Sequence, residues 1–291
     1  MKKNILITGA SGFIGSHVLD DCLKNNFNVY AIFRHSKKNV SFAKKYKKQI
    51  FPIFYNNIYE IKNKLTNCKI DYVIHCATHY IKKHDHNDIE NIIKSNVLFS
   101  TIVLDAVVNI KIKKFINLGT VWQHFNDTKN LAFNLYAASK QSFECIYNYY
   151  KKQYKKIKFY NILLTDTFGA NDKRKKLVPT LVKNYKNKNK DKINIPKNLA
   201  MNLVNVNEVT KCLNILLKNN FESNNYVIKS NQGIKIFDLI NFLNNKLKKK
   251  IQINWSRNTK NYKIIKLKNL LRKENNIKKE ILKLFNENNK N

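Results

Sequence analysis

Several residue types that usually shape a fold are scarce in this chain of 291 residues. It holds 6 glycines and 3 prolines, and arginine occurs only as Arg34, Arg174, Arg257 and Arg272 although lysine is abundant. The 5 cysteines contain no C-x-x-C pair, so neither a disulfide framework nor a zinc site is indicated. Free cysteines suit a reducing compartment, and we therefore expect a cytoplasmic protein.

Long hydrophobic runs are also missing. No apolar stretch reads as long enough to span a bilayer, and the run after the N-terminal lysines soon reaches a glycine. We therefore expect no membrane segment, and we interpret the first residues as a strand rather than a signal peptide.

The charge is strongly one-sided, with a formal net charge of +36. Such an excess often indicates a polyanionic partner. Here, however, the better phosphate ligand, arginine, is rare, and no basic motif of a known nucleic-acid-binding module occurs. We interpret the lysines as solvated surface and expect no specific nucleic acid partner.

Strand and helix patterns alternate along the first part of the chain. After a first strand in "NILITG", strands are expected at 28–33, 49–55, 71–77, 114–120 and 158–165, and helices notably at 88–109 and 136–155. This alternation predicts an α/β fold of the Rossmann type, with a doubly wound parallel sheet that binds ligands at the carboxyl ends of its strands.

The pattern changes after residue 165, where lysine and asparagine dominate. We expect a Rossmann domain at 1–165 and a smaller substrate-binding lobe at 166–291, of which about 203–228 returns to the sheet. The tail from about 258 is charged and helix-prone, and its role stays open.

Three of the six glycines lie together in "TGASGFIG", as Gly9, Gly12 and Gly15. They follow the first strand and open the first helix, where a pyrophosphate can rest on the helix N-terminus. At the end of the second strand, where NAD-binding sheets usually carry an acid, stand Arg34 and His35. A cation there can bind a 2′-phosphate, so the expected cofactor is NADP(H).

The stretch "LYAASK" places Tyr136 four residues before Lys140, on one face of a helix. The same spacing recurs at Tyr147/Lys151, Tyr154/Lys158 and Tyr262/Lys266, so it does not identify a site by itself.

Four motifs stand in order along the chain: "TGASGFIG", "DYVIHCAT", "NLGT" and "LYAASK". Together they resemble the extended short-chain dehydrogenases/reductases of the nucleotide-sugar (NAD-dependent epimerase/dehydratase) family. "NLGTVWQHF", "NLYAASKQSFE" and "LLTDTFGANDKRKKLVP" look most like the CDP-abequose and CDP-paratose synthase group, over about residues 3–240. The resemblance implies an NADPH-dependent reductase of a nucleoside-diphosphate 4-keto-deoxysugar, CDP-linked and made for surface polysaccharide, and a homodimer through the helices at 88–109 and 136–155.

The resemblance also implies roles for single residues. Tyr136 would protonate the carbonyl oxygen while Lys140 lowers its pKa and holds the nicotinamide ribose. Thr120 would bond the same oxygen, and Asn96 would anchor a water of a proton relay. The expected cofactor-binding residues are Gly9, Ser11, Gly12, Phe13, Ile14, Gly15, Arg34, His35, Asn57, Ala77, Thr78 and Lys140.

For the substrate, Arg174 in "NDKRKK" is the expected ligand of the diphosphate. The expected lining of the sugar pocket is His79, Trp122, Gln123 and His124. His79, His84, Asp85 and His86 could be imagined as metal ligands, but the family uses no metal and we expect none.

Departures from the family narrow the activity. Val121 and Trp122 follow Thr120 where 4,6-dehydratases carry Asp-Glu, which disfavours a dehydratase, and Arg34 disfavours the tightly held NAD of epimerases. An epimerase of the same fold stays open, as do a non-enzymatic nucleotide-binding regulator and a nucleic-acid binder. The motifs do not distinguish the base, the sugar or the configuration at C4, because family members that share them form opposite epimers.

Overall fold

The computed structural model describes residues 2–186, 193–259, 261–273 and 275–286. Its centre is a parallel sheet of seven strands in the order β11-β6-β5-β4-β1-β2-β3. The strands are β1 (Asn4–Thr8), β2 (Asn28–Arg34), β3 (Ile50–Tyr55), β4 (Tyr72–His75), β5 (Lys114–Thr120), β6 (Lys158–Leu164) and β11 (Asn225–Ile228). The predicted α/β fold with a doubly wound sheet is confirmed, and the strand order reverses between β1 and β4.

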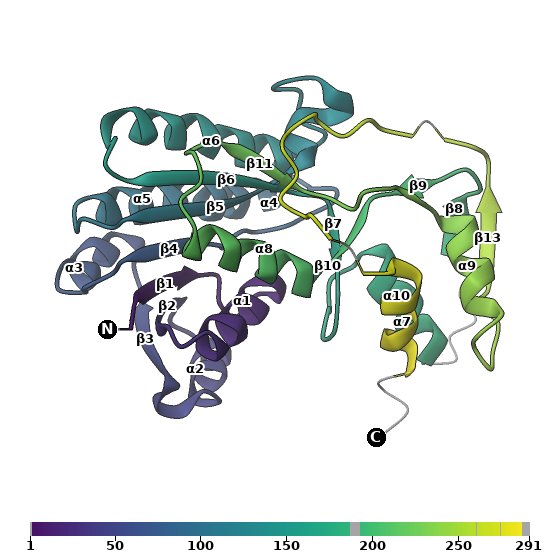
Figure 1. The fold of residues 1–291 in the computed structure, drawn as a ribbon, viewed down its shortest axis with the longest axis horizontal. Coiled ribbons are helices and arrows are strands. Elements are labelled where there is room, and N and C mark those ends of the chain that lie inside the picture. Colours follow the sequence, from purple (N-terminus) through teal and green to yellow (C-terminus); the bar gives the residue numbers. More distant parts are fainter. Residues whose placement is uncertain (1, 187–192, 260, 274, 287–291) are drawn as a thin grey trace.

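Helices cover both faces of this sheet (Figure 1). One face carries α1 (Phe13–Lys24), α2 (Lys37–Lys44) and α8 (Val206–Lys218). The other carries α3 (Ile61–Thr66), α4 (Asp88–Ile93), the π-helical turn η3 (Lys94–Leu98), α5 (Phe99–Val108) and α6 (Leu135–Gln153). Because both faces are covered, the consecutive residues Ile5, Leu6 and Ile7 of β1 are all fully buried.

The helical run Asp88–Val108 corrects one expectation from the sequence. By length and composition it is apolar enough to cross a membrane, the one such helix among the described residues. Half of it is buried inside the fold, where Val103, Leu104 and Val107 pack into the core. We interpret its apolar character as that of a core helix.

A second lobe follows β6. It contains α7 (Leu177–Lys186), β8 (Ile193–Pro196), β9 (Ala200–Met201), β12 (Ile234–Lys235), α9 (Ile236–Asn244), β13 (Ile253–Ser256) and α10 (Ile277–Asn286). The short parallel pair of β7 (Asp166–Phe168) and β10 (Leu203–Asn205) leads into and out of it. The core of this lobe gathers residues such as Leu181, Leu239 and Phe285. The 3₁₀ turns in the described part of the chain are η1 (Lys47–Gln49), η2 (Ile58–Glu60) and η4 (Val121–Asp127).

The chain crosses between the two parts more than once. After β10, α8 packs on α1 and β11 pairs with β6. After β13 the chain returns to the sheet again (Figure 1), where Val227 N donates to Lys268 O at 3.1 Å and Leu270 N donates to Val227 O at 2.9 Å. The boundary at residue 165 stays a prediction.

Candidate active site

The turn between β1 and α1 needs glycine for steric reasons. Gly9 has a φ of +67°, and a Cβ added at Gly15 would lie 2.1 Å from the Gly9 carbonyl oxygen. Gly12 is the N-cap of α1, and no side chain caps its first turn. Backbone N–H groups are therefore available to an anion, and these residues fit the pyrophosphate of a dinucleotide.

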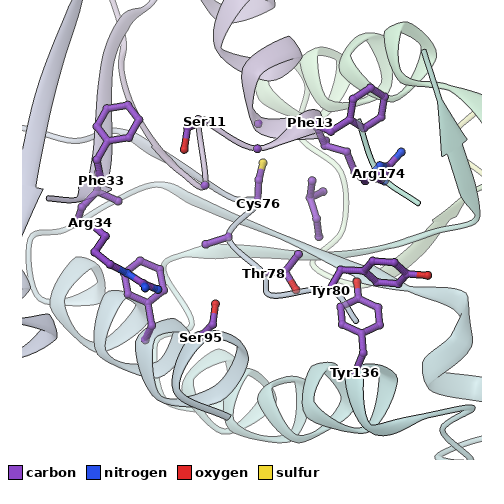
Figure 2. A pocket seen from close by; sticks show the side chains of 18 of the residues that line it. Ser11, Phe13, Phe33, Arg34, Cys76, Thr78, Tyr80, Ser95, Tyr136 and Arg174 are labelled. Atoms are coloured by element: carbon purple, nitrogen blue, oxygen red, sulfur yellow. The ribbon is translucent and has the colours of Figure 1, made fainter. Parts of the chain in front are cut away.

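A cleft of about 900 Å³ lies over this turn and the carboxyl ends of the central strands (Figure 2). Many of the predicted site residues line it, namely Gly9, Ser11, Gly12, Phe13, Ile14, Gly15, Arg34, Ala77, Thr78, Thr120, Trp122, Tyr136 and Arg174. Its cationic lining comprises Arg34, Lys38, Lys94, Arg174 and Lys176, and no aspartate or glutamate of the described part of the chain joins them. The cleft therefore suits an anionic ligand.

One end of the cleft, on the left of Figure 2, is formed by Arg34 at the end of β2. The side chain of Arg34 interacts with the Tyr55 hydroxyl, although burial of that phenol outweighs the cation and raises the pKa of Tyr55. Ser36, the N-cap of α2, and Lys38 also line this end. His35 lies beside Phe54 outside the lining, and Asn57 caps η2 while its neighbour Asn56 faces the cleft.

The opposite end holds Tyr136 near the start of α6. This helix begins after Asn134, whose side chain accepts a hydrogen bond from Ala137 N at 2.9 Å. The edge of the Tyr80 ring packs on Tyr136, with the ring centroids 4.9 Å apart. Thr120 closes β5 and lines the same cleft. The structure thus brings a phenol and a hydroxyl into the lining of one cleft.

The expected lowering of the Tyr136 pKa by Lys140 is wrong for this structure. Although the phenol borders the cleft, burial raises its pKa to about 12, and the nearby Thr78 and Arg174 only partly offset this. The lysine itself is 1% exposed, and burial lowers its pKa to about 8, with Cys76 and Glu144 favouring its charge. For both groups, the effect of desolvation on the pKa is therefore larger than any electrostatic effect of one group on the other. The phenol stays protonated at neutral pH.

Asn96 is fully buried in η3, and its amide is engaged on every side. Its Oδ1 accepts from His79 N at 2.6 Å and from the Thr78 hydroxyl at 3.1 Å. Its Nδ2 donates to His79 O at 3.1 Å and to Ser139 Oγ at 2.9 Å. Asn96 thereby fixes the loop after β4, which lines the cleft, to the helix that carries Tyr136.

A second cavity of about 480 Å³ adjoins the first and shares Tyr80, Trp122, Tyr136, Thr165 and Lys176 with it. Its far wall is apolar and belongs to the second lobe, with residues such as Leu177, Ile195, Pro196 and Met201.

An aromatic cluster forms another wall of the second cavity. It consists of Trp122, Phe125, Phe133 and Tyr262, whose closest ring centroids, those of Phe125 and Tyr262, are 4.5 Å apart. Tyr262 comes from the C-terminal tail, which is anchored here because Lys263 N donates to Asn126 Oδ1 at 3.2 Å. The tail whose role the sequence left open therefore completes a cavity next to Tyr136.

Of the residues predicted to bind the substrate, some line a cavity and others do not. Trp122 lines both cavities, whereas Arg174 lines only the larger cleft. His79, Gln123 and His124 line neither.

Gln123 and His124 lie behind the site, where they surround a buried carboxylate. Gln123 Oε1 accepts from Thr120 N at 2.8 Å, and its Nε2 donates to Glu144 at 2.6 Å. His124 Nε2 lies 3.8 Å from the same carboxylate, and burial lowers the pKa of its imidazole. Gln123 therefore holds the backbone of Thr120 in position. Neither Gln123 nor His124 lines a cavity in which it could contact a ligand. Among the described residues, no group of three His, Cys, Asp or Glu side chains could hold a metal ion.

Sequence reasoning missed Tyr80, Phe125, Phe133 and Tyr262. The available signals were weak: Tyr80 follows the fourth strand by a few residues, and Tyr262 is an aromatic residue in a tail rich in lysine and asparagine. Neither position belongs to a motif, and only the fold brings them to the cavity.

Comparisons with known proteins find relatives in sequence and in fold. Two curated relatives are both named CDP-abequose synthase. The one from Salmonella muenchen is 24% identical over 245 residues, covering 81% of this chain and 77% of the relative, and the one from Yersinia pseudotuberculosis is 25% identical over 212 residues, covering 72% and 71%.

Solved structures share the fold. UDP-glucuronic acid 4-epimerase from Bacillus cereus, in complex with UDP-glucuronic acid and NAD, gives a TM-score of 0.81 at 18% identity and covers 98% of this chain and 99% of its own. UDP-glucose 4-epimerase from Thermotoga maritima gives 0.77 at 18% identity, with the same coverage. The model of the NAD dependent epimerase/dehydratase family matches residues 5–228. This confirms the resemblance seen in the sequence, and the chain belongs to that family of enzymes.

Proposed function

We propose that the chain is an NADPH-dependent reductase of a nucleoside-diphosphate 4-keto-deoxysugar, with a CDP-linked sugar as substrate. The relatives named CDP-abequose synthase support the CDP-linked sugar. The observation that carries the choice of cofactor is the end of β2, where Arg34, Ser36 and Lys38 line the cleft without a carboxylate among the described residues. A 2′-phosphate matches these groups, whereas the ribose hydroxyl of NAD usually pairs with an acid.

The chemistry needs one hydride and one proton. When bound, NADPH supplies the hydride to C4 of the keto sugar. Tyr136 donates its proton to the carbonyl oxygen, so that the C4=O double bond becomes a single bond with a new C–H and a new O–H bond. Thr120, which lines the same cleft, would hydrogen-bond that oxygen. The second cavity, which adjoins Tyr136, takes the nucleotide sugar.

The competing proposal is a nucleotide-sugar epimerase of the same fold. It is favoured by the solved structures of 4-epimerases, which carry UDP-sugars and NAD. An epimerase returns its hydride to the sugar and keeps its cofactor, so that its net reaction is redox-neutral. The proposed reductase instead consumes one NADPH for each product.

Cofactor titration tests the proposal first. NADPH and NADH are titrated by fluorescence against the wild type, Arg34→Ala and the control Lys37→Ala, which removes an exposed cation outside the cleft lining. We expect NADPH to bind at least about tenfold more tightly than NADH, and only Arg34→Ala to lose this preference. Equal binding of the two cofactors by the wild type would remove the basis for NADPH and make the epimerase the leading function.

Turnover then tests the substrate. The purified protein is incubated with NADPH and CDP-, UDP- and dTDP-linked 4-keto-deoxysugars, and NADPH oxidation is followed by absorbance. Stoichiometric oxidation with the CDP-linked sugar supports the proposal. Conversion of a sugar nucleotide without net oxidation identifies the epimerase instead.

A homodimer is part of the same proposal. The helical pair implied by the resemblance carries exposed apolar residues, with Ile93 at 41% and Tyr149 at 60% exposure. Light scattering gives the mass of the assembly, and a monomer at micromolar concentration would contradict this part.

A further inference from the structure

Four consecutive cations follow β7. The fourth, Lys176, lines both cavities, whereas the first three face three different places. Arg174 lines the cofactor cleft, Lys175 lines the second cavity, and Lys173 is exposed and belongs to neither lining. The sequence suggested that this basic run serves the substrate. The structure instead divides it between two ligand sites.

Arg174 is held rigidly by its own loop. Its Nε donates to Asp172 Oδ1 at 2.8 Å and its Nη2 donates to Asp172 Oδ2 at 2.8 Å. Nη2 also donates to the Thr167 carbonyl oxygen at 2.8 Å. The Asp172 side chain is only 2% exposed, so this paired contact is shielded from water and fixes the plane of the guanidinium.

The other face of Arg174 contacts the glycine-rich turn. Its guanidinium carbon lies 4.0 Å from the centroid of the Phe13 ring, and Figure 2 shows the two side chains side by side. Phe13 is the first residue of α1 and directly follows the N-cap Gly12. The loop after β7 is thus joined to the place where a pyrophosphate fits.

The hydrogen-bond inventory of Arg174 leaves one edge available. A guanidinium has five N–H groups, and those on Nε and Nη2 are used by Asp172 and Thr167. The two on Nη1 have no acceptor among the described residues, and the side chain lines the cleft. The buried carboxylate fixes the orientation of Arg174, and the free Nη1 edge of the guanidinium can donate hydrogen bonds to a phosphate.

We propose that Arg174 binds the pyrophosphate of the cofactor, and that the substrate diphosphate is bound by lysines of the second cavity such as Lys175. The identity of the two ligands rests on the proposed function. Arg174 would then tie the loop that leads into the second lobe to the bound cofactor, while Lys175 on the same loop contacts the substrate.

Two binding titrations test this division. NADPH is titrated alone, and CDP, as a probe of the diphosphate site, is titrated at saturating NADPH so that it does not occupy the cofactor cleft. We expect Arg174→Ala to weaken NADPH binding about 10- to 100-fold and to leave CDP binding within about twofold. Lys175→Ala should do the reverse, with a loss of CDP affinity of about threefold to tenfold. The matched control Lys173→Ala should change neither.

Folding of the loop is controlled separately, because Arg174→Ala leaves a buried carboxylate unpaired. The double variant Asp172→Asn/Arg174→Ala removes that charge and should show the same loss of NADPH affinity. Phe13→Leu keeps Arg174 but removes its aromatic support, and should weaken NADPH binding about threefold.

Two outcomes overturn the inference. If Arg174→Ala or the double variant binds NADPH as the wild type does, or loses CDP affinity as strongly as NADPH affinity, Arg174 is not a dedicated cofactor residue. If the wild type binds NADPH but none of CDP, UDP and dTDP, both the proposed substrate class and the role of Lys175 are wrong. The role of Arg174 in NADPH binding is then decided only by the NADPH titration of its variants.

Discussion

The two cavities that meet at Tyr136 are built in different ways. The larger cleft draws on short contiguous pieces, above all the glycine turn and the end of β2, and its charged lining among the described residues is entirely cationic. The second cavity is assembled from the loop after β5, α7, the strands β8 and β9 and the C-terminal tail, and its walls are largely aromatic and aliphatic. Its one carboxylate among the described residues, Asp166, is paired with Lys176 at 3.0 Å.

This difference separates a site that depends on local backbone geometry from one that depends on segments far apart in the sequence. A cofactor site needs fixed backbone geometry, which glycine spacing enforces locally. A substrate site needs a shaped volume, which side chains from distant segments provide together. A substitution in the lining of one cavity should therefore weaken binding there and leave binding in the other cavity unchanged.

The largest effect is expected at the junction. Tyr136→Phe removes the proton donor but keeps the ring, so turnover should fall about 100- to 10,000-fold while both binding affinities stay within about twofold. Steady-state rates and NADPH titration measure this. The control Tyr147→Phe alters a buried hydroxyl elsewhere on α6 and should keep most activity. Full activity in Tyr136→Phe would exclude this phenol from the chemistry.

The next effect should be confined to the larger cleft. Gly15→Ala places a methyl group 2.1 Å from the Gly9 carbonyl oxygen, so the turn must open and NADPH affinity should fall at least about tenfold. Gly233→Ala is the matched control, because its added carbon would meet only Met201 O at an ordinary 3.7 Å. Unchanged NADPH binding in Gly15→Ala would show that the turn does not hold the cofactor. CDP binding should survive both changes.

A smaller effect should be confined to the second cavity. Tyr262→Ala removes one of four rings from the aromatic cluster, and we expect CDP or substrate affinity to fall about threefold to tenfold with NADPH affinity unchanged. Tyr262→Phe should retain affinity, and Tyr59→Ala removes a ring that is 69% exposed as a control. Fluorescence of Trp122 should report ligand entry, in a Trp255→Phe background that leaves it as the single tryptophan. Loss of NADPH affinity in Tyr262→Ala would mean that the cavities do not act separately.

The last prediction concerns stability rather than binding, and it involves the buried cation Lys140. Lys140 has a folded-state pKa of about 8 against an ordinary value of 10.5, so the folded protein releases this proton first. Its titration should therefore raise stability between about pH 8 and 10.5, by about 3 kcal/mol in total. Urea unfolding of the wild type and Lys140→Met across this range isolates the contribution. An identical pH dependence in both proteins would contradict burial as the cause.

The sequence predicted the strands and helices of the sheet well because each carries its own periodicity, and burial on both faces made strands such as β1 continuously apolar. It also located Gly9, Arg34, Thr120 and Tyr136, since each closes or follows a strand or opens a helix and the carboxyl ends of parallel strands meet at one edge. It misjudged the electrostatics of Tyr136 and Lys140, because desolvation depends on atoms from the whole fold.

By itself, then, the amino-acid sequence determined the Rossmann sheet, the glycine turn and the position of the tyrosine, because these depend on local steric rules and regular periodicity. Only the tertiary structure decided which cation faces which cavity. Lys173, Arg174 and Lys175 are adjacent in the sequence, but the buried Asp172 and the ring of Phe13 direct Arg174 into the larger cleft. It also decided that Tyr262, far along the chain, stands beside Trp122, because contacts between segments so distant in sequence exist only once the sheet has formed.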